Sequence, residues 1–334
     1  MTANELNVEV LFLTKSQVED LLSFKEVVDA VELAFRATGE KNVIMPQKFP
    51  MFLDSPKNDN FLIAMPAYVK PIGIAGVKWA HLYFDQKPGA PTVWGVVILN
   101  DPTTGLPCAI MDGTSITNMR TGGHAAVAAK YLSKPNASSV AIIGCGTEGR
   151  THLRALKEVR PQIERVQLFD LREEAMAGLI DDLAGTLQAE FVKTGSAREA
   201  VTGVDIVCMT TTSQTPVVMH DWIGEGCFVA GAYSFNDLDP MLSKTADKWV
   251  LGCWESDEHR IIDFPGRKLS MPVSKEDVYG DLGDIIVGRK PGRENDRERI
   301  VYTHLGMGAL DIAVASHAYR KAMEKGIGQR LRLN

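Results

Sequence analysis

Residues 140–149 read VAIIGCGTEG, an apolar run that leads directly into three glycines spaced G-x-G-x-x-G. Between a strand and a helix, the first glycine permits a tight turn and the second lets backbone N–H groups approach a pyrophosphate. The third lets the helix pack closely on the strand, so that the helix N-terminus faces the phosphates. The next apolar run, residues 166–169, ends at Asp170, where an acid can bind the adenosine ribose. The pattern predicts a dinucleotide site; the alternative is a glycine turn that serves only packing.

The residues assigned to this cofactor site lie in the glycine loop, at the ends of two strands and near the start of a helix: Gly144, Cys145, Gly146, Thr147, Glu148, Gly149, Asp170, Leu171, Arg172, Thr210, Thr211 and Thr117. Asp170 would repel a 2′-phosphate and favours NAD, whereas Arg172 could pair with that phosphate in NADP. We therefore favour NAD and keep NADP as the alternative. For Thr210 and Thr211, which follow the apolar run 206–209, an ordinary polar loop is an equal alternative to cofactor contact.

Around this loop the chain alternates strands and helices. Short apolar runs at 140–143, 166–169, 206–209, 227–231 and 249–251 are typical of a parallel sheet covered on both faces. We therefore expect an α/β fold with a doubly wound parallel sheet in this half of the chain.

The first third has a different pattern. Ser23 and Glu26 have capping-box spacing and predict a helix that continues to about residue 38. Four strand candidates follow, which predict an antiparallel meander suited to substrate binding or subunit pairing: residues 61–65, 72–84, 92–99 and 107–111. A helix over 116–132 then leads to a predicted hinge at 133–136, and a last helix covers 310–325.

Composition narrows the class of protein. The chain has 334 residues, 45% of them hydrophobic, which allows about two domains. The 36 Lys and Arg against 42 Asp and Glu include no dense basic stretch, so we expect no nucleic-acid partner. The apolar runs are shorter than the roughly 20 residues of a membrane span. The opening MTANELN does not read as a signal peptide, so we expect a cytoplasmic protein without a membrane partner.

Cysteine and histidine spacing argues against a metal site. The five cysteines form no CxxC pair, and the seven histidines form neither HxxxH nor HExxH. We expect reduced, buried thiols and no bound metal.

Three cations in the first domain are candidates for the chemistry. Alternation along 72–84 places Lys78 on an otherwise apolar face, where burial would lower its pKa and fit it to bind a carboxylate or pass a proton. Arg120 precedes two glycines at a helix start and suits a bidentate grip on a carboxylate. Lys48 lies in a proline-rich loop. The alternatives are a snorkelling Lys78, a surface arginine and a solvated lysine. Together the cations suggest a small anionic substrate, most simply an amino, imino or 2-oxo acid.

These segments resemble the ornithine cyclodeaminase/mu-crystallin family of nicotinamide-dependent proteins. The matching segments stand in family order over almost the full length: FLIAMPAY (61–68), GVK (76–78), MRTG (119–122), the glycine loop (144–149), GRKPGR (288–293) and GMGALD (306–311). The resemblance implies a Rossmann NAD(P)-binding domain at 133–309. It also implies a discontinuous α+β substrate-binding and dimerisation domain at 1–132 and 310–334, and a homodimer. In the family, Lys78 and Arg120 match residues that hold the substrate carboxylate and polarise the reacting group.

The chain also departs from the cyclodeaminases of that family. Lys48 stands where they have an arginine, and Ile63 where they have an acid. Ser234 aligns with their aspartate after the fifth strand of the Rossmann domain, and Asp237 or Asp239 could replace that aspartate. The ketimine reductases resemble this chain in having a small residue there.

The resemblance therefore favours hydride transfer between NAD(P)H and the C=N carbon of a small imino acid, either a cyclic ketimine or the imine of a 2-oxo acid. In this hypothesis Lys78 is catalytic, assisting proton transfer, while Lys48, Lys78, Arg120 and Ser234 bind substrate. The alternatives are ornithine cyclodeamination with catalytic NAD and a non-enzymatic small-ligand-binding protein like mu-crystallin.

Overall fold

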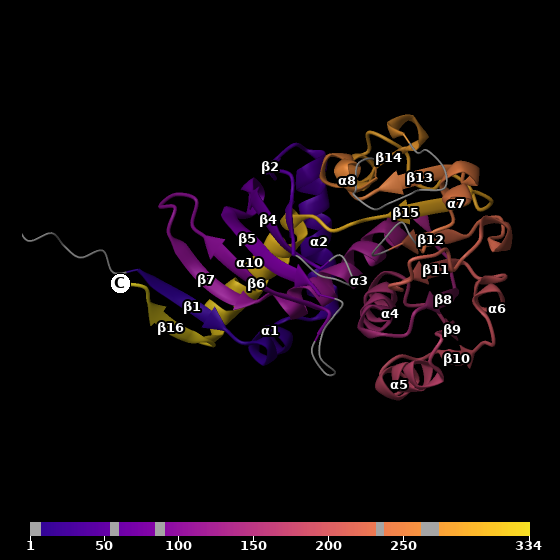
Figure 1. The fold of residues 1–334 in the computed structure, drawn as a ribbon, viewed down its shortest axis with the longest axis horizontal. Helices are drawn as coiled ribbons and strands as arrows, with labels where there is room; N and C mark the ends of the chain where they lie inside the picture. Colours follow the sequence, from indigo (N-terminus) through magenta and orange to yellow (C-terminus); the bar gives the residue numbers. More distant parts are fainter. Residues whose placement is uncertain (1–7, 54–59, 84–90, 232–236, 262–273) are drawn as a thin grey trace, which may run out of the picture. The chain divides into compact units, whose positions relative to one another are not determined.

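The computed structural model describes residues 8–53, 60–83, 91–231, 237–261 and 274–334, which form two compact units (Figure 1). Unit 1 comprises Met1–Arg120 and Met307–Asn334, and unit 2 comprises Thr121–Gly306. The sequence places the boundaries after residue 132 and before residue 310, whereas the units separate after Arg120 and after Gly306. The physical reason lies at Gly122, where an added Cβ would lie 2.4 Å from the Thr151 carbonyl oxygen. This part of the helix therefore packs with the second unit.

Unit 1 is built on a mostly antiparallel sheet with the order β16-β1-β7-β6-β5-β4-β2, in which β3 also pairs with β4. The strands are β1 (Glu9–Leu13), β2 (Val43–Ile44), β3 (Phe49–Phe52), β4 (Phe61–Val69), β5 (Ile74–Leu82), β6 (Val93–Asn100), β7 (Pro107–Asp112) and β16 (Gln329–Arg332). Strands β4 to β7 form the predicted antiparallel meander. At one edge, β1 pairs parallel with β7 and antiparallel with β16.

Helices pack on this sheet and on one another. Helices α1 (Lys15–Leu21) and α10 (Gly308–Lys325) contact its strands, α2 (Phe24–Gly39) packs mainly on α10, and a 3-10 turn η1 (Lys70–Ile72) joins β4 to β5. The predicted capping box begins α2, since Ser23 N donates to Glu26 Oε2 at 2.9 Å and Glu26 N donates to Ser23 Oγ at 3.3 Å. Helix α10 packs on β4, β5 and β6. A Cβ at Gly308 would lie 2.7 Å from the Met65 carbonyl oxygen, so glycine lets the first turn of α10 approach the sheet.

Unit 2 contains a parallel sheet with the order β10-β9-β8-β11-β12-β15-β13-β14. Its strands are β8 (Ser139–Ile143), β9 (Arg165–Phe169), β10 (Glu190–Lys193), β11 (Ile206–Met209), β12 (Phe228–Gly231), β13 (Lys248–Leu251), β14 (Gly280–Asp281) and β15 (Ile300–Thr303). The five predicted strands are β8, β9, β11, β12 and β13, and the unpredicted β15 lies between β12 and β13. Chain order reverses on either side of β8, and ligands bind at such a switch point in doubly wound sheets.

The helices of unit 2 connect these strands. They are α4 (Thr147–Val159), α5 (Glu173–Leu183), α6 (Ala197–Val201), α7 (Pro240–Thr245), α8 (Trp254–Ile261) and α9 (Leu282–Ile286), with 3-10 turns η2 (His220–Trp222) and η3 (Lys275–Asp277). The long helix α3 (Gly113–Leu132) contains the unit boundary. Within the described ranges, we find no helix with the length and apolarity of a membrane span.

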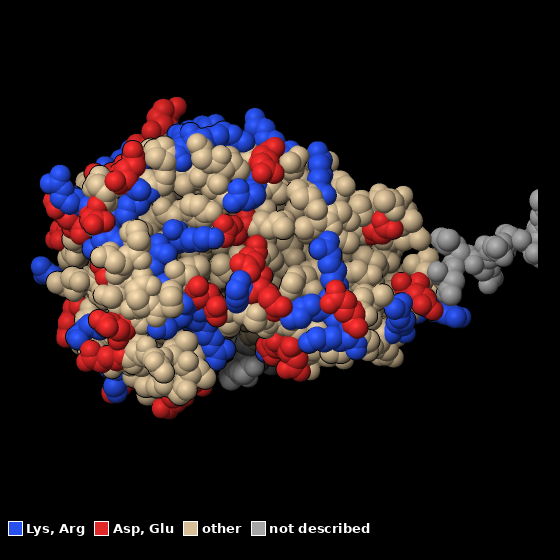
Figure 2. All heavy atoms as spheres, turned by 180° about the vertical axis from the view of Figure 1, so that it is seen from behind, with Lys and Arg blue, Asp and Glu red and all other residues tan. Residues whose placement is uncertain are grey.

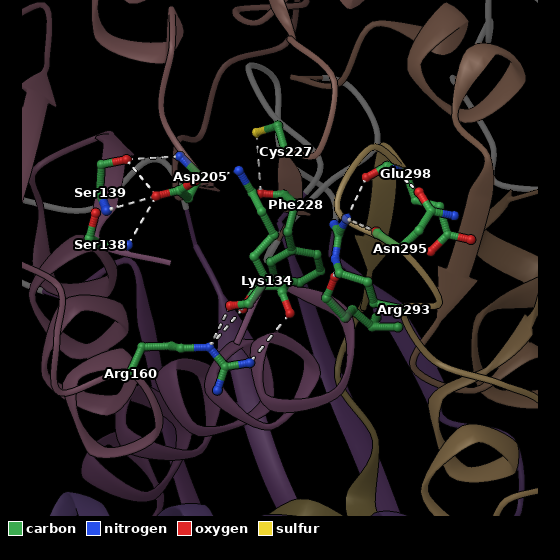
Figure 3. Close-up of polar contacts among 12 residues, drawn as sticks. Lys134, Ser138, Ser139, Arg160, Asp205, Cys227, Phe228, Arg293, Asn295 and Glu298 are labelled. Atoms are coloured by element: carbon green, nitrogen blue, oxygen red, sulfur yellow. Dashed lines mark hydrogen bonds and ion pairs between the residues drawn. The ribbon is translucent and has the colours of Figure 1, made fainter. Parts of the chain in front are cut away.

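The connector from α3 to β8 is braced by charged side chains (Figure 3). Arg160 donates to backbone carbonyls at the end of α3, including that of Ala129 at 2.9 Å. Arg293 Nε donates to the Leu132 carbonyl at 2.7 Å. The carboxylate of Asp205 accepts from two backbone N–H groups of the connector and pairs with Lys134 at 2.7 Å. The predicted hinge at 133–136 is therefore tied to unit 2.

The distribution of surface charge and the state of the cysteines agree with the composition. Basic and acidic side chains are interspersed on the face shown in Figure 2. The cysteines are free thiols, as predicted; Cys108 is half-buried and the other four are buried. Burial raises the pKa of the Cys145 thiol to about 12, with Asp170 adding to the effect.

Candidate functional site

Lys78 is the centre of a buried charged cluster in unit 1. Its side chain lies on β5, and its neighbours across the sheet are Met65 and Val97. The residue is only 2% exposed, so the predicted ammonium on an apolar face is confirmed and the snorkelling alternative is wrong. The Nζ atom donates to Asp311 Oδ1 at 2.9 Å and to Thr117 Oγ1 at 3.2 Å. One of its three N–H donors therefore remains for a ligand.

Arg120 joins the same carboxylate from helix α3. It is 7% exposed, so it is not the surface arginine of the alternative. Its Nε donates to Asp311 Oδ1 at 3.0 Å. Within the described residues, its two terminal nitrogens make no hydrogen bond, which leaves the planar fork that binds carboxylates in a bidentate manner. Lys48 is likewise buried, at 5% exposure.

Electrostatics favours an anion at this cluster. Burial lowers the pKa of Lys78 to about 8, with Arg120 and Lys48 adding to the effect and Asp311 opposing it. Burial alone would raise the pKa of Asp311, but Lys78 and Arg120 outweigh it and hold that pKa below its ordinary value. With Lys78 protonated, Lys78, Arg120 and Asp311 together carry a formal charge of +1. A bound carboxylate would offset this charge, because buried charges are stabilised by pairing.

Asp311 is the member of this cluster that was not predicted from the sequence. It lies in the first turn of α10, is 0% exposed, and accepts from both cations through one oxygen. Its second oxygen, Oδ2, has no hydrogen-bond partner within the described chain. The sequence carries a signal, because Asp311 stands in the apolar run 309–315, and a charged side chain is almost never fully buried unless it is paired.

The glycine loop in unit 2 has the geometry of a phosphate cradle. Gly144 has a φ of 97°, which favours glycine, and an added Cβ would lie 2.8 Å from the Thr210 carbonyl oxygen. At Gly149 a Cβ would lie 2.4 Å from the Gly144 carbonyl oxygen. At Gly146, by contrast, no atom lies within 4 Å of an added Cβ. Gly146 is also the N-cap of α4 and offers no side chain to its first N–H groups. The loop is tight where it packs and open where a pyrophosphate would bind.

Asp170 is tied to this loop. Its Oδ2 accepts from Cys145 N at 2.8 Å, and its Oδ1 accepts from Arg172 N at 2.9 Å. The Cys145 N–H therefore already has a partner. The guanidinium of Arg172 is exposed, with Nε 3.7 Å from Asp170 Oδ1, and Leu171 is 94% exposed. The acid and the competing arginine predicted from sequence thus lie side by side at the end of β9.

The remaining predicted residues divide between the two units. Thr147 and Glu148 lie in the first turn of α4, and Thr210 Oγ1 donates to the Gly144 carbonyl at 2.7 Å. Thr117 belongs to unit 1, where its hydroxyl accepts from Lys78.

Two aspartates follow β12 in the sequence. Thr211 Oγ1 donates to Asp237 Oδ2 at 3.0 Å. Asp239 caps α7 by accepting from Met241 N at 2.9 Å, and it also accepts from the backbone N–H and Nδ1 of His220. Asp237 is therefore the aspartate that reaches the threonine loop, whereas Asp239 is engaged in a cap. Ser234 lies outside the described residues.

Comparisons with known proteins give matches over almost the whole chain. The family model described as "Ornithine cyclodeaminase/mu-crystallin family" matches residues 8–326. Alanine dehydrogenase of Archaeoglobus fulgidus is 35% identical, over 97% of this chain and 98% of its own. The Thermococcus litoralis Δ1-pyrroline-2-carboxylate reductase, solved with NADH and L-proline, has a TM-score of 0.88 and 33% identity, covering 96% and 100% of the two chains.

A third relative is an archaeal alanine dehydrogenase dimer solved with bound NAD. It has a TM-score of 0.89 and 33% identity, over 98% of this chain and 100% of that one. The buried Lys78–Asp311–Arg120 cluster, the glycine loop on a parallel sheet and these full-length matches agree, and the chain belongs to the ornithine cyclodeaminase/mu-crystallin family.

Proposed function

We propose that this protein is an NAD(P)H-dependent oxidoreductase that interconverts a small imino acid and the corresponding amino acid. The observation that carries the proposal is the buried cluster of unit 1, in which Lys78 and Arg120 share one carboxylate oxygen of Asp311 and Arg120 keeps its terminal nitrogens for a ligand. A substrate carboxylate is the ligand whose charge and shape fit this cluster. Two relatives reported above, an alanine dehydrogenase and a pyrroline-2-carboxylate reductase, support the same chemistry.

The residues of the cluster have separate tasks. The terminal nitrogens of Arg120 bind the substrate carboxylate, because Nε is already engaged with Asp311. Lys78 holds a proton at Nζ at neutral pH, since its pKa is about 8, and can give it to the imine nitrogen. The dinucleotide, when bound, supplies the hydride for the C=N carbon. The product is then an amine with one new C–H bond and one new N–H bond.

NAD is the cofactor that the loop residues support. Asp170, at the end of β9, would repel a 2′-phosphate and accept hydrogen bonds from the ribose. Both related structures named above carry NAD or NADH. The exposed Arg172 beside Asp170 could pair with a 2′-phosphate, so NADP is the alternative cofactor.

The surroundings of Ile63 favour an imino acid without a second amine. Ile63 is 5% exposed and packs in an apolar cluster with Phe61, Met65 and Ala80. An ammonium group placed there would lose its hydration without gaining a carboxylate partner. We therefore favour small cyclic or alkyl imino acids over ornithine as substrates.

A turnover panel tests this proposal. NADH and NADPH consumption is measured with Δ1-pyrroline-2-carboxylate and with pyruvate plus ammonia or methylamine, alongside ammonia release from ornithine with NAD. We expect NADH consumption with at least one imino acid. Conversion of ornithine to proline without net NADH would contradict the proposal and indicate cyclodeamination. Binding of cofactor without turnover of any compound would favour a binding protein.

Arg120→Lys gives the panel a matched variant. It keeps the charge but removes the fork, so we expect KM for the imino acid to rise by about tenfold or more while the Kd for NADH stays unchanged. The control is Arg36→Lys, a change at a half-exposed arginine of α2, for which we expect the wild-type KM. Equal KM values for the two variants would show that Arg120 does not bind the substrate carboxylate.

We further propose a homodimer that pairs through the face of the unit 1 sheet opposite α10. Neighbouring strands present large apolar side chains on this face, with Trp79 41% and Trp94 48% exposed. Val96 lies beside Trp79, and Ile98 continues the face. A second copy would cover this apolar surface, and the related archaeal alanine dehydrogenase is a dimer.

The free cysteine thiols indicate in which cellular compartment the protein resides. All five cysteines are free, and burial raises the pKa values of Cys145, Cys227 and Cys253. Because reduced cysteines are typical of proteins in a reducing compartment, we propose the cytoplasm, to be tested by cell fractionation.

A further inference from the structure

Two cations share one oxygen of one buried carboxylate in unit 1. Asp311 Oδ1 lies 2.9 Å from Lys78 Nζ and 3.0 Å from Arg120 Nε. All three side chains are less than a tenth exposed, so water contributes little to holding them in place. The acid also lies in the first turn of α10, where the helix dipole favours a negative charge. Its ionised form is therefore stabilised from three directions.

The placement of Asp311 determines which donors of its partners remain for a ligand. By accepting from Nε, it leaves the terminal fork of Arg120 unused among the described residues. Together with Thr117 it occupies two of the three N–H donors of Lys78. The remaining donors of both cations are those available to a substrate carboxylate and the reacting nitrogen.

We propose that Asp311 is the positioning residue of this site: it aims Lys78 and Arg120 at the substrate and keeps Lys78 charged in the neutral pH range. The part of this inference that concerns the substrate rests on the proposed function. The effect of Asp311 on the charge of Lys78 does not depend on that function. The titratable groups that act on Lys78 are Asp311 from α10, Arg120 from α3 and Lys48 from the segment before β3. Its cross-strand neighbours, Met65 and Val97, carry no charge. Asp311 is thus the group in this set that favours the ammonium.

The test is the pH at which Lys78 becomes nucleophilic, which needs no turnover. Wild-type protein and variants are treated with cyanate from about pH 5 to about pH 10, and carbamylation of Lys78 is quantified by peptide mass spectrometry relative to the exposed Lys25. In the wild type we expect half-maximal reactivity near pH 8, because the pKa of Lys78 is about 8. In Asp311→Asn, which keeps the side-chain shape, we expect a shift of about 1–3 units to lower pH.

Two controls separate positioning from simple stability. Asp311→Glu keeps the charge and should keep the wild-type midpoint. Glu26→Gln breaks another ion pair of unit 1, that with Lys321 at 2.7 Å, and should lower Tm without moving the midpoint. If Asp311→Asn lowers Tm but leaves the midpoint in place, Asp311 is only structural and the inference is overturned. A Lys78 that cyanate does not reach at any pH would overturn it as well, because the proposed ligand donors must be accessible.

Turnover provides the second readout. The alkaline limb of kcat/KM for imino acid reduction should move with the labelling midpoint in Asp311→Asn. If the wild type turns over no imino acid while the labelling shift is present, the proposed function fails and the role of Asp311 stands. If turnover is present without either shift, the role of Asp311 fails and the proposed function stands.

Discussion

Replacing Gly146 by alanine separates cofactor binding from folding at the glycine loop. The backbone of Gly146 has a φ of −78°, outside the left-handed region that favours glycine, and no atom lies within 4 Å of the added Cβ. Such a change is expected to alter stability by less than about 1 kcal/mol. If the pyrophosphate lies against this backbone, the methyl group takes its space at a cost of about 1–3 kcal/mol. The Kd for NADH should then rise roughly 5- to 150-fold.

Two matched variants complete this experiment. Gly149→Ala places its Cβ 2.4 Å from the Gly144 carbonyl oxygen, so it should lower both Tm and NADH affinity. Gly185→Ala also meets no atom within 4 Å and should change neither quantity. Kd is measured by NADH fluorescence titration and Tm by differential scanning fluorimetry. If Gly146→Ala binds NADH as tightly as Gly185→Ala, the pyrophosphate does not lie over this glycine and the cofactor assignment is wrong.

Three further predictions concern pH, the connector and assembly. Because the pKa of Lys78 is about 8 when folded and 10.5 ordinarily, kcat/KM should fall as pH rises through about 8. Between about pH 8 and pH 10.5 Lys78 is protonated in the unfolded chain but not in the folded one, so its contribution to the free energy of unfolding should rise with pH. In urea titrations, Lys78→Met should not show this rise. Asp205→Ala removes acceptors from the connector and should lower the free energy of unfolding by about 2–4 kcal/mol in urea titrations. Trp79→Glu should give monomers in light scattering, whereas Met323→Glu, at the same 41% exposure on α10, should leave dimers; dimers of both would exclude the proposed face.

Local patterns predict much of this molecule. The loop at 144–149 is predictable because strand, glycine and helix signals are contiguous in the chain. Lys78 is predictable because strand alternation shows which face it shares. The capping box at Ser23 predicts the start of α2, because its hydrogen bonds join residues that are only three apart in the sequence.

The features that sequence reasoning missed depend on distant partners. Asp311 lies 233 residues from Lys78 in the chain, and no local pattern joins them. Strand β15 is short, and its place between β12 and β13 follows from pairing rather than from its own residues. The predicted hinge contains proline and serine, as hinges do, but the arginines that brace it come from other segments, Arg160 and Arg293.

The fate of the hydride tests the central claim most directly. The protein is incubated with NADH deuterated at the transferable C4 position and with Δ1-pyrroline-2-carboxylate, and the product is analysed by mass spectrometry. The buried cluster of Lys78, Arg120 and Asp311 predicts proline with one deuterium at the former C=N carbon, and loss of that product in Lys78→Met. Unlabelled product, or no product with any small imino acid while NADH still binds, would contradict the account.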